Sequence, residues 1–259
     1  MMPTGPAGPT ESTGPPSTLR ASFDDLDGRT VEFECEPTIA SHWVARDILA
    51  GKTYPILSFV DDVRVVLDVG ANCGAAAVYF GHHYPDATVH AFEPGSPQRA
   101  VLERNVAELR NVVVHPVGLH ATDQELPLYF GSSDSGMSSV IRTEWHGDEH
   151  EIVQLRSAAA WAAEHDVTSI DVLKVDVEGV EEDVLQSLSP LLPTVKVLYL
   201  EYDSRSARRT AARLLDPTHE LFVGKMFLDQ GEVTYLRKDL ADHPGATEWL
   251  RSIFTPTDG

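Results

Sequence analysis

Residues 63 to 74 read Val-Arg-Val-Val-Leu-Asp-Val-Gly-Ala-Asn-Cys-Gly, and their pattern indicates the fold class. A short run rich in β-branched residues ends at Val69, and a glycine turn from Gly70 to Gly74 follows it directly. Residues 75 to 83 then have the pattern of a helix. A strand, a glycine turn and a helix in this order are typical of a doubly wound α/β fold, which places its ligand at such a turn.

Beyond this stretch, short apolar runs alternate with helical patterns. This alternation predicts a parallel sheet with crossover helices, in a domain that covers residues 61–240. The expected strands are residues 63–69, 88–92, 112–117, 170–175, 195–201, 219–223 and 233–237. The expected helices between them are residues 75–83, 96–109, 157–165, 181–188 and 204–215.

Three flanking segments and one insertion accompany this domain. Residues 1–18 hold five prolines and three glycines and have almost nothing to bury, so we expect a disordered tail. Residues 19–60 predict a hairpin and a helix that form a small N-terminal cap, and residues 241–259 a C-terminal helix and tail. Residues 119–154 are too long for a simple connection, which favours an insert that covers the substrate. An ornamental hairpin is the alternative.

Composition excludes several classes of partner. With 42% hydrophobic residues among 259, the chain can bury a sizeable core. Its net charge of −20 repels phosphate groups, so we expect neither nucleic-acid binding nor binding to an anionic membrane. The two cysteines, Cys35 and Cys73, match no zinc spacing and fit a reducing cytoplasm. We therefore expect a soluble cytoplasmic protein that acts on a small molecule, and the sequence leaves a homodimer open.

Two acidic residues indicate which ligand the glycine turn binds. Glu93 lies nineteen residues after Gly74, where an acid in such folds hydrogen-bonds a ribose. Asp68 lies at the turn itself, where each like-charge pair with a pyrophosphate ~5 Å away would cost about 3 kcal/mol. S-adenosylmethionine has no phosphate and carries two positive groups. Asp68 therefore favours S-adenosylmethionine over a dinucleotide, although tight strand-to-helix packing is the alternative for the turn.

Five segments in a fixed order are far more specific than the turn alone. They are residues 68–74 (Asp-Val-Gly-Ala-Asn-Cys-Gly), 91–94 (Ala-Phe-Glu-Pro), Asn105, 135–139 (Ser-Gly-Met-Ser-Ser) and 170–179 (Ile-Asp-Val-Leu-Lys-Val-Asp-Val-Glu-Gly). With them the chain resembles the FkbM-type S-adenosylmethionine-dependent methyltransferases over roughly residues 54–201. Cys73 departs from that family, which usually has an aliphatic residue there.

The resemblance implies a fold, a reaction and a cofactor site. It implies a Rossmann-like class I methyltransferase with a mostly parallel, seven-stranded sheet and helices on both faces. It also implies methyl transfer, most often to a hydroxyl of a sugar or secondary metabolite. The residues implied to bind the cofactor are Asp68, Gly70, Asn72 and Gly74 for the methionine part, Glu93 for the ribose, Leu119 near the adenine, and Tyr54 nearby. A tyrosine buried in the core is the alternative for Tyr54.

Candidate catalytic residues follow the strands, because open α/β sheets bind ligands at the carboxyl ends of their strands. Asp176 and Glu178 follow the fourth strand, and Glu201 follows the fifth. In an extended chain, Lys174, Asp176 and Glu178 share one face. The two carboxylates could accept a hydroxyl proton or hold a divalent cation. Alternatively, Glu178 orients the next helix and only Asp176 reaches the cavity.

Histidine is the other natural base, because its pKa lies near neutrality. His120 follows the third strand. We therefore predict Asp176, Glu178 and His120 as the catalytic residues, and we predict no bound metal. Two rival functions remain. A nucleotide-dependent oxidoreductase would place a pyrophosphate beside Asp68, and a non-catalytic module would bind an adenosine cofactor without chemistry.

Overall fold

The computed structural model describes residues 18–131, 138–143 and 146–254. The predicted disordered tail, residues 1–18, lies outside this part except for its last residue. The polar middle of the insert, residues 132–137, and the last five residues also lie outside it.

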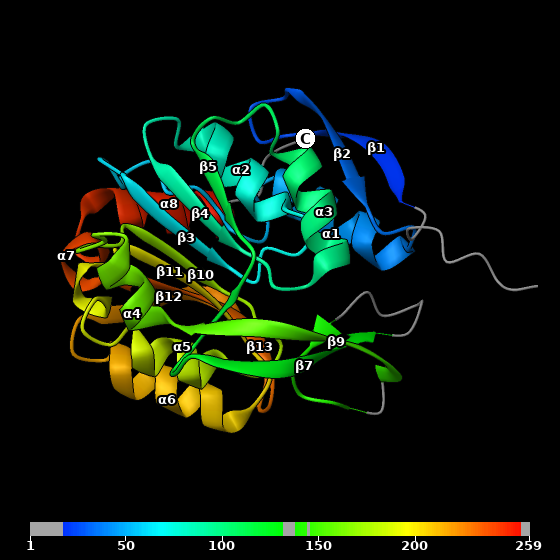
Figure 1. The fold of residues 1–259 in the computed structure, drawn as a ribbon. Coiled ribbons are helices and arrows are strands. Elements are labelled where there is room, and N and C mark those ends of the chain that lie inside the picture. Colours follow the sequence, from blue (N-terminus) through cyan, green and yellow to red (C-terminus); the bar gives the residue numbers. More distant parts are fainter. Residues whose placement is uncertain (1–17, 132–137, 144–145, 255–259) are drawn as a thin grey trace, which may run out of the picture.

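The centre of the structure is a seven-stranded sheet in the order β12-β13-β11-β10-β3-β4-β5 (Figure 1). Its strands are β3 (Val65–Val69), β4 (Thr88–Phe92), β5 (Val112–His115), β10 (Val172–Val175), β11 (Val197–Tyr202), β12 (His219–Met226) and β13 (Gly231–Arg237). Strand β13 runs antiparallel to both of its neighbours, and the other pairs are parallel. The sheet is therefore mixed, with one reversed strand.

Helices cover both faces of this sheet (Figure 1). One face carries α1 (Ile39–Leu49), α2 (Ala75–His83), α3 (Ser96–Asn105) and α8 (Pro244–Phe254). The other carries α4 (Ala158–Glu164), α5 (Glu181–Ser187) and α6 (Arg205–Leu215). A 3-10 turn (Leu192–Thr194) and the short α7 (Lys238–Ala241) complete the helices of the described part. Alternate residues of β3 enter different cores, with Val66 on the first face and Leu67 and Val69 on the second.

The N-terminal segment packs as part of the first core. Its hairpin consists of β1 (Leu19–Asp24) and β2 (Thr30–Cys35), which pair antiparallel. Phe23 and Phe33 are buried in the same cluster as Phe80 of α2. Asn105 at the end of α3 also donates hydrogen bonds to the backbone oxygens of Glu34 and Cys73, at 2.7 and 2.8 Å. This one side chain therefore ties the hairpin to the glycine turn.

The described part of the insert forms a second sheet, in the order β6-β9-β7-β8. Its strands are β6 (Gly118–His120), β7 (Gln124–Gly131), β8 (Ser138–Ser139) and β9 (His146–Ser157). Strand β9 pairs with β7 antiparallel and with β6 parallel, so the insert is more than a simple hairpin. Leu128, Val153 and Leu155 give it a small core of its own.

Within the described ranges, none of the helices combines the length and the apolar character that crossing a membrane requires.

Candidate functional site

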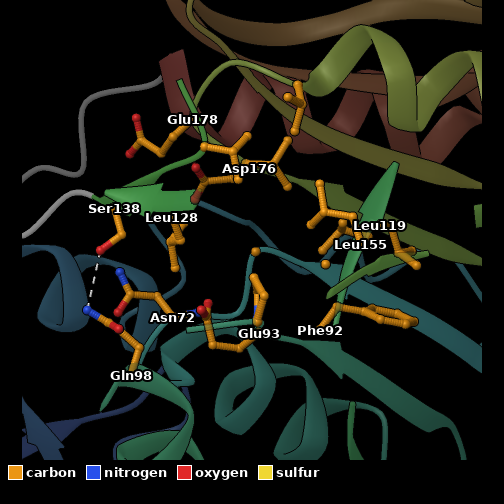
Figure 2. A pocket seen from close by; sticks show the side chains of 17 residues that line it. Asn72, Phe92, Glu93, Gln98, Leu119, Leu128, Ser138, Leu155, Asp176 and Glu178 are labelled. Atoms are coloured by element: carbon orange, nitrogen blue, oxygen red, sulfur yellow. Dashed lines mark hydrogen bonds between the residues drawn. The ribbon is translucent and has the colours of Figure 1, made fainter. Parts of the chain in front are cut away.

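A cavity lies at the carboxyl ends of β3, β4 and β10, and the insert closes one of its sides (Figure 2). It encloses about 720 Å³, part of which is open to solvent. Its lining residues are Val69, Gly70, Asn72, Phe92, Glu93, Pro94, Gln98, Gly118, Leu119, Leu128, Ser138, Val140, Leu155, Asp176, Val177, Glu178 and Val180. In the sheet, β3 lies between β4, which follows it in the sequence, and β10, which comes much later. The strand order therefore reverses at β3, and open α/β sheets bind ligands in the crevice at such a point.

The two ends of this first cavity differ in chemistry. Phe92, Leu119 and Leu155 gather at one end, whereas Asp176 and Glu178 lie at the other (Figure 2). The cavity therefore suits an elongated ligand that has one apolar part and one positively charged part.

The backbone of the glycine turn forms part of the cavity wall. Gly70 and Asn72 line it, with φ angles of +84° and +49°. The backbone N–H groups of Gly70 and Ala71 both donate to the Phe92 carbonyl, at 3.2 and 2.9 Å, which fixes the turn against β4. Gly74 does not line the cavity; a side chain there would meet Leu102 of α3.

Glu93 anchors the same turn while it faces the cavity. Its two carboxylate oxygens accept hydrogen bonds from the backbone N–H groups of Asn72 and Gly95, both at 2.8 Å. Burial raises the pKa of Glu93 to about 7, against the opposing effect of these hydrogen bonds. The predicted contact of Glu93 with a ribose stays a prediction, but its position in the wall of the cavity allows it.

Asp68 lies behind the cavity wall, and its predicted contact with a cofactor stays a prediction. Asp68 is fully buried and does not line the cavity. Strand pairing sets Lys174 of β10 directly beside it, and the Lys174 ammonium lies 3.1 Å from the Asp68 carboxylate. Burial alone would lower the pKa of Lys174, but attraction to Asp68 and Asp176 raises it. Of these two acids, it is therefore Asp176 rather than Asp68 that faces the cavity.

The loop after β10 departs from the predicted alternation. The strand ends at Val175, and Glu178 and Gly179 have φ angles of +54° and +115°. This turn brings Val177 to the cavity together with Asp176 and Glu178, so these residues do not alternate between two faces as they would in an extended chain. Burial, followed by repulsion from Asp176, raises the pKa of Glu178 to about 8. Glu178 can therefore take up a proton near neutral pH.

Tyr54 is a core residue that also contacts the site. Its side chain is buried and packs against the rings of Phe80 and Tyr199. Its hydroxyl donates a hydrogen bond of 3.5 Å to the Asp176 carboxylate. Tyr54 does not line the first cavity, so the structure places it behind Asp176.

His120 lies outside the first cavity. Its ring nitrogens contact the Gln124 amide at 2.9 Å and the Asp183 carboxylate at 3.4 Å. Nothing tests its predicted catalytic role, which stays a prediction.

Sequence reasoning missed Gln98, which joins α3 to the insert. Gln98 lines the cavity, and its amide donates to the Ser138 hydroxyl at 3.4 Å (Figure 2). It also donates to the Glu36 carboxylate at 3.0 Å. Gln98 carries no motif signal, whereas the alternating apolar residues of β7 and β9 could have indicated that Leu128 and Leu155 face inward.

Among the described residues, the side chains that could ligate a metal together lie away from the cavity. In the described part of the chain, the only group of three metal-ligating side chains within 4.8 Å of one another is Asp25, Asp27 and His83. These residues lie in the turn between β1 and β2 and at the end of α2. The carboxylates of Asp176 and Glu178 are not part of such a group.

The buried acid of the cavity predicts a pH dependence of stability. In the folded protein, the Glu178 carboxyl group keeps its proton up to about pH 8. In the unfolded chain, the same group loses its proton near its ordinary pKa of 4.5. The folded state binds more protons in this window, so the free energy of unfolding should decrease as the pH rises through it. Each unit of pKa difference corresponds to about 1.4 kcal/mol.

Urea unfolding at pH 5 and pH 8 measures this decrease. We expect Glu178→Gln to lose less stability between the two pH values than the native protein loses. Glu220→Gln, which changes an exposed acid of β12, is the control and should keep the native dependence. A native protein that is more stable at pH 8 than at pH 5 would contradict the assignment.

Comparison with known proteins identifies a family and several relatives. The model of the family described as "Methyltransferase FkbM domain" matches residues 68–227. The chain is 30% identical over 167 residues to "Methyltransferase 1" of Beauveria bassiana, covering 56% of this chain and 66% of that protein. It is 28% identical over 181 residues to "Methyltransferase sdnD" of Sordaria araneosa, covering 58% and 70%.

A third relative is "2-O-methyltransferase NoeI" of Sinorhizobium fredii, 24% identical over 155 residues that cover 54% of this chain and 64% of that protein. The matched segments thus span about two thirds of the length of these relatives. The family match includes the glycine turn, Glu93 and the loop after β10, which together form the cavity. The chain therefore belongs to the FkbM methyltransferase family, as its sequence motifs predicted.

Proposed function

We propose that the chain uses S-adenosylmethionine to methylate a hydroxyl group of a small molecule. The observation that carries the proposal is the first cavity, which joins an apolar end to an acidic end across a glycine turn. Membership of the FkbM family supports the methyl transfer. The name of the Sinorhizobium relative, a 2-O-methyltransferase, supports oxygen as the acceptor atom.

The residues present fit this cofactor. Phe92, Leu119 and Leu155 offer an apolar surface for an adenine, and Glu93 lies next to the turn where a ribose would bind. The Asp176 carboxylate would stabilise the two positive groups of the methionine part. When bound, the cofactor supplies a methyl group whose bond to sulfur breaks, leaving the electron pair on sulfur, as the acceptor oxygen bonds to the methyl carbon.

The chain itself contributes position and proton acceptance. Lys174 and Tyr54 hold the Asp176 carboxylate from two sides, with 3.3 Å to the ammonium and 3.5 Å to the hydroxyl. Holding an acceptor in line can supply most of the rate enhancement of a displacement. The proton that the acceptor hydroxyl loses can pass to Glu178, whose pKa of about 8 suits a base near neutral pH.

The overall charge supports a small-molecule acceptor. The net charge of −20 disfavours binding to the phosphates of a nucleic acid.

Calorimetric titration with S-adenosylhomocysteine and, separately, with NAD tests the proposal. We expect micromolar binding of the first ligand and none of the second. Glu93→Ala should weaken S-adenosylhomocysteine binding at least 100-fold, because the N–H groups of Asn72 and Gly95 lose their acceptor and the turn loses its anchor. Glu103→Ala removes an exposed acid of α3 and is the control.

Two results would refute the proposal. Binding of NAD would favour the oxidoreductase, and binding of neither ligand to a folded native protein would exclude an adenosine cofactor. Glu93→Gln, which keeps one acceptor oxygen, covers the case in which Glu93→Ala does not fold. A non-catalytic module would bind S-adenosylhomocysteine but would show no methyl transfer. In an enzyme, Asp176→Asn should abolish methyl transfer.

A further inference from the structure

A second cavity lies on the other side of Tyr54 from the first. It encloses about 1020 Å³, part of it open to solvent, between residues 51–55, β11, the β12–β13 hairpin and α8. Its lining residues are Gly51, Lys52, Thr53, Tyr54, Pro55, Tyr199, Leu200, Glu201, Val223, Gly224, Lys225, Glu232, Val233, Thr234, Trp249 and Ile253. The insert, which we expected to cover the substrate, contributes none of them.

The two cavities share a wall at the catalytic carboxylates. Tyr54 lines the second cavity, and its hydroxyl bonds to Asp176, which lines the first. Glu201 also lines the second cavity, and Asp176 and Glu178 are among the charges that act on it. A molecule in the second cavity therefore lies next to the acidic end of the first.

An irregularity in β12 helps to form this space. The pairing of β12 with β13 shifts between Leu221 and Val223, so Phe222 is an extra residue. Val223, Gly224 and Lys225, which follow this bulge, line the cavity. Bulges are frequent beside active sites, where they redirect the side chains that follow them.

Strand pairing sets two acids directly opposite each other in the second cavity. Glu201 of β11 pairs with Glu232 of the antiparallel β13. Like charges in this position destabilise a sheet. The arrangement is unfavourable for the chain alone and becomes favourable when a cation lies against the pair.

Of the two acids, Glu232 has a lysine as counter-ion, whereas Glu201 has none among the described residues. Lys225 lies 3.9 Å from Glu232, and Lys52 lies 3.3 Å from Asp47. Throughout the described ranges, the Glu201 carboxylate has neither an ion pair nor a hydrogen bond to a side chain. Burial, and then repulsion from Asp176, raises its pKa, which fits an acid that lacks a partner.

The rest of the lining suits a polar, hydroxyl-bearing molecule. Thr53 and Thr234 contribute hydroxyl groups, and Trp249 contributes an aromatic ring. Aromatic faces also attract a cation that lies over them.

We propose that the second cavity binds the methyl acceptor, and that this acceptor is a polyhydroxylated small molecule with a protonated amine held between Glu201 and Glu232. This inference rests on the proposed methyl transfer. The amine lies at the acid pair, and a hydroxyl of the same molecule reaches the shared wall at Asp176.

Glucosamine and glucose are matched probes, because they share a ring and differ in one amine. Each is titrated by calorimetry into protein saturated with S-adenosylhomocysteine, at a pH where the amine is protonated. We expect glucosamine to bind at least tenfold more tightly than glucose. Glu201→Gln should remove this preference and leave S-adenosylhomocysteine affinity within threefold of native. Glu232→Gln is the second variant, and Glu220→Gln the control that keeps the preference.

The outcomes separate this inference from the proposed function. Equal binding of the two sugars, or binding of neither to a protein that binds S-adenosylhomocysteine, would overturn the inference alone. A preference that survives in both Glu201→Gln and Glu232→Gln would do the same. Failure to bind S-adenosylhomocysteine would instead refute the proposed function.

Discussion

Gly70→Ala is expected to reduce S-adenosylhomocysteine affinity at least 100-fold, which corresponds to about 2.7 kcal/mol of binding free energy. A Cβ atom at this position would lie 1.8 Å from the backbone oxygen of Asp176 and 2.9 Å from its carbonyl carbon. These are backbone atoms, so they cannot rotate away as a side chain would. The glycine turn and the loop after β10 would have to separate, and both line the first cavity.

The strain of a non-glycine residue at a positive φ also contributes to the effect of Gly70→Ala. A second glycine, Gly28, allows this strain to be measured by itself. Gly28 has a φ of +76°, close to the +84° of Gly70, but a Cβ atom there meets nothing within 4 Å. Gly28→Ala should therefore lose about 1 kcal/mol of stability to the unfavourable φ and keep native affinity. Calorimetry and thermal unfolding measure both variants. A Gly70→Ala protein that binds within threefold of native would show that the two loops are not in contact.

Local patterns were sufficient to predict most of the fold. The β-branched runs and the helical segments between them correspond to the strands and helices of the main sheet, and the family motifs led to the family that the comparison confirmed. The pairing within the insert could not be predicted in this way. Strand β9 joins β6 to β7, and its partners depend on contacts between distant residues rather than on its own alternation.

The site was predicted less completely, for the same physical reason. Gly70, Asn72, Glu93, Leu119, Asp176 and Glu178 line the first cavity because each lies at the end of a predicted strand or in the turn after it. The pairing of Asp68 with Lys174 could not be predicted, because Lys174 is far away in the sequence and reaches Asp68 only through the register of two parallel strands. The second cavity depends on four separate segments, and no single stretch of sequence indicates it.

Lys174→Met is expected to remove about 3 to 5 kcal/mol of stability, a large part of the 5 to 15 kcal/mol typical of a whole protein. Lys174 is 3% exposed, and its ammonium pairs with Asp68 and Asp176 and donates to the Gly70 carbonyl. Methionine fills the space but leaves the Asp68 carboxylate buried without a counter-ion. Urea unfolding measures the loss.

Two further variants separate loss of the ion pair from loss of packing. Lys52→Met removes an ammonium that lies 3.3 Å from Asp47 on the surface, where the two side chains are 63% and 38% exposed, so about 1 kcal/mol or less should be lost. Asp68→Leu combined with Lys174→Met removes both buried charges and should recover part of the stability, because a charge without its partner is the main penalty. The recovery is incomplete, since Asp176 and the Gly70 carbonyl still lack the ammonium. A double variant no more stable than Lys174→Met would mean that the lysine acts through packing alone.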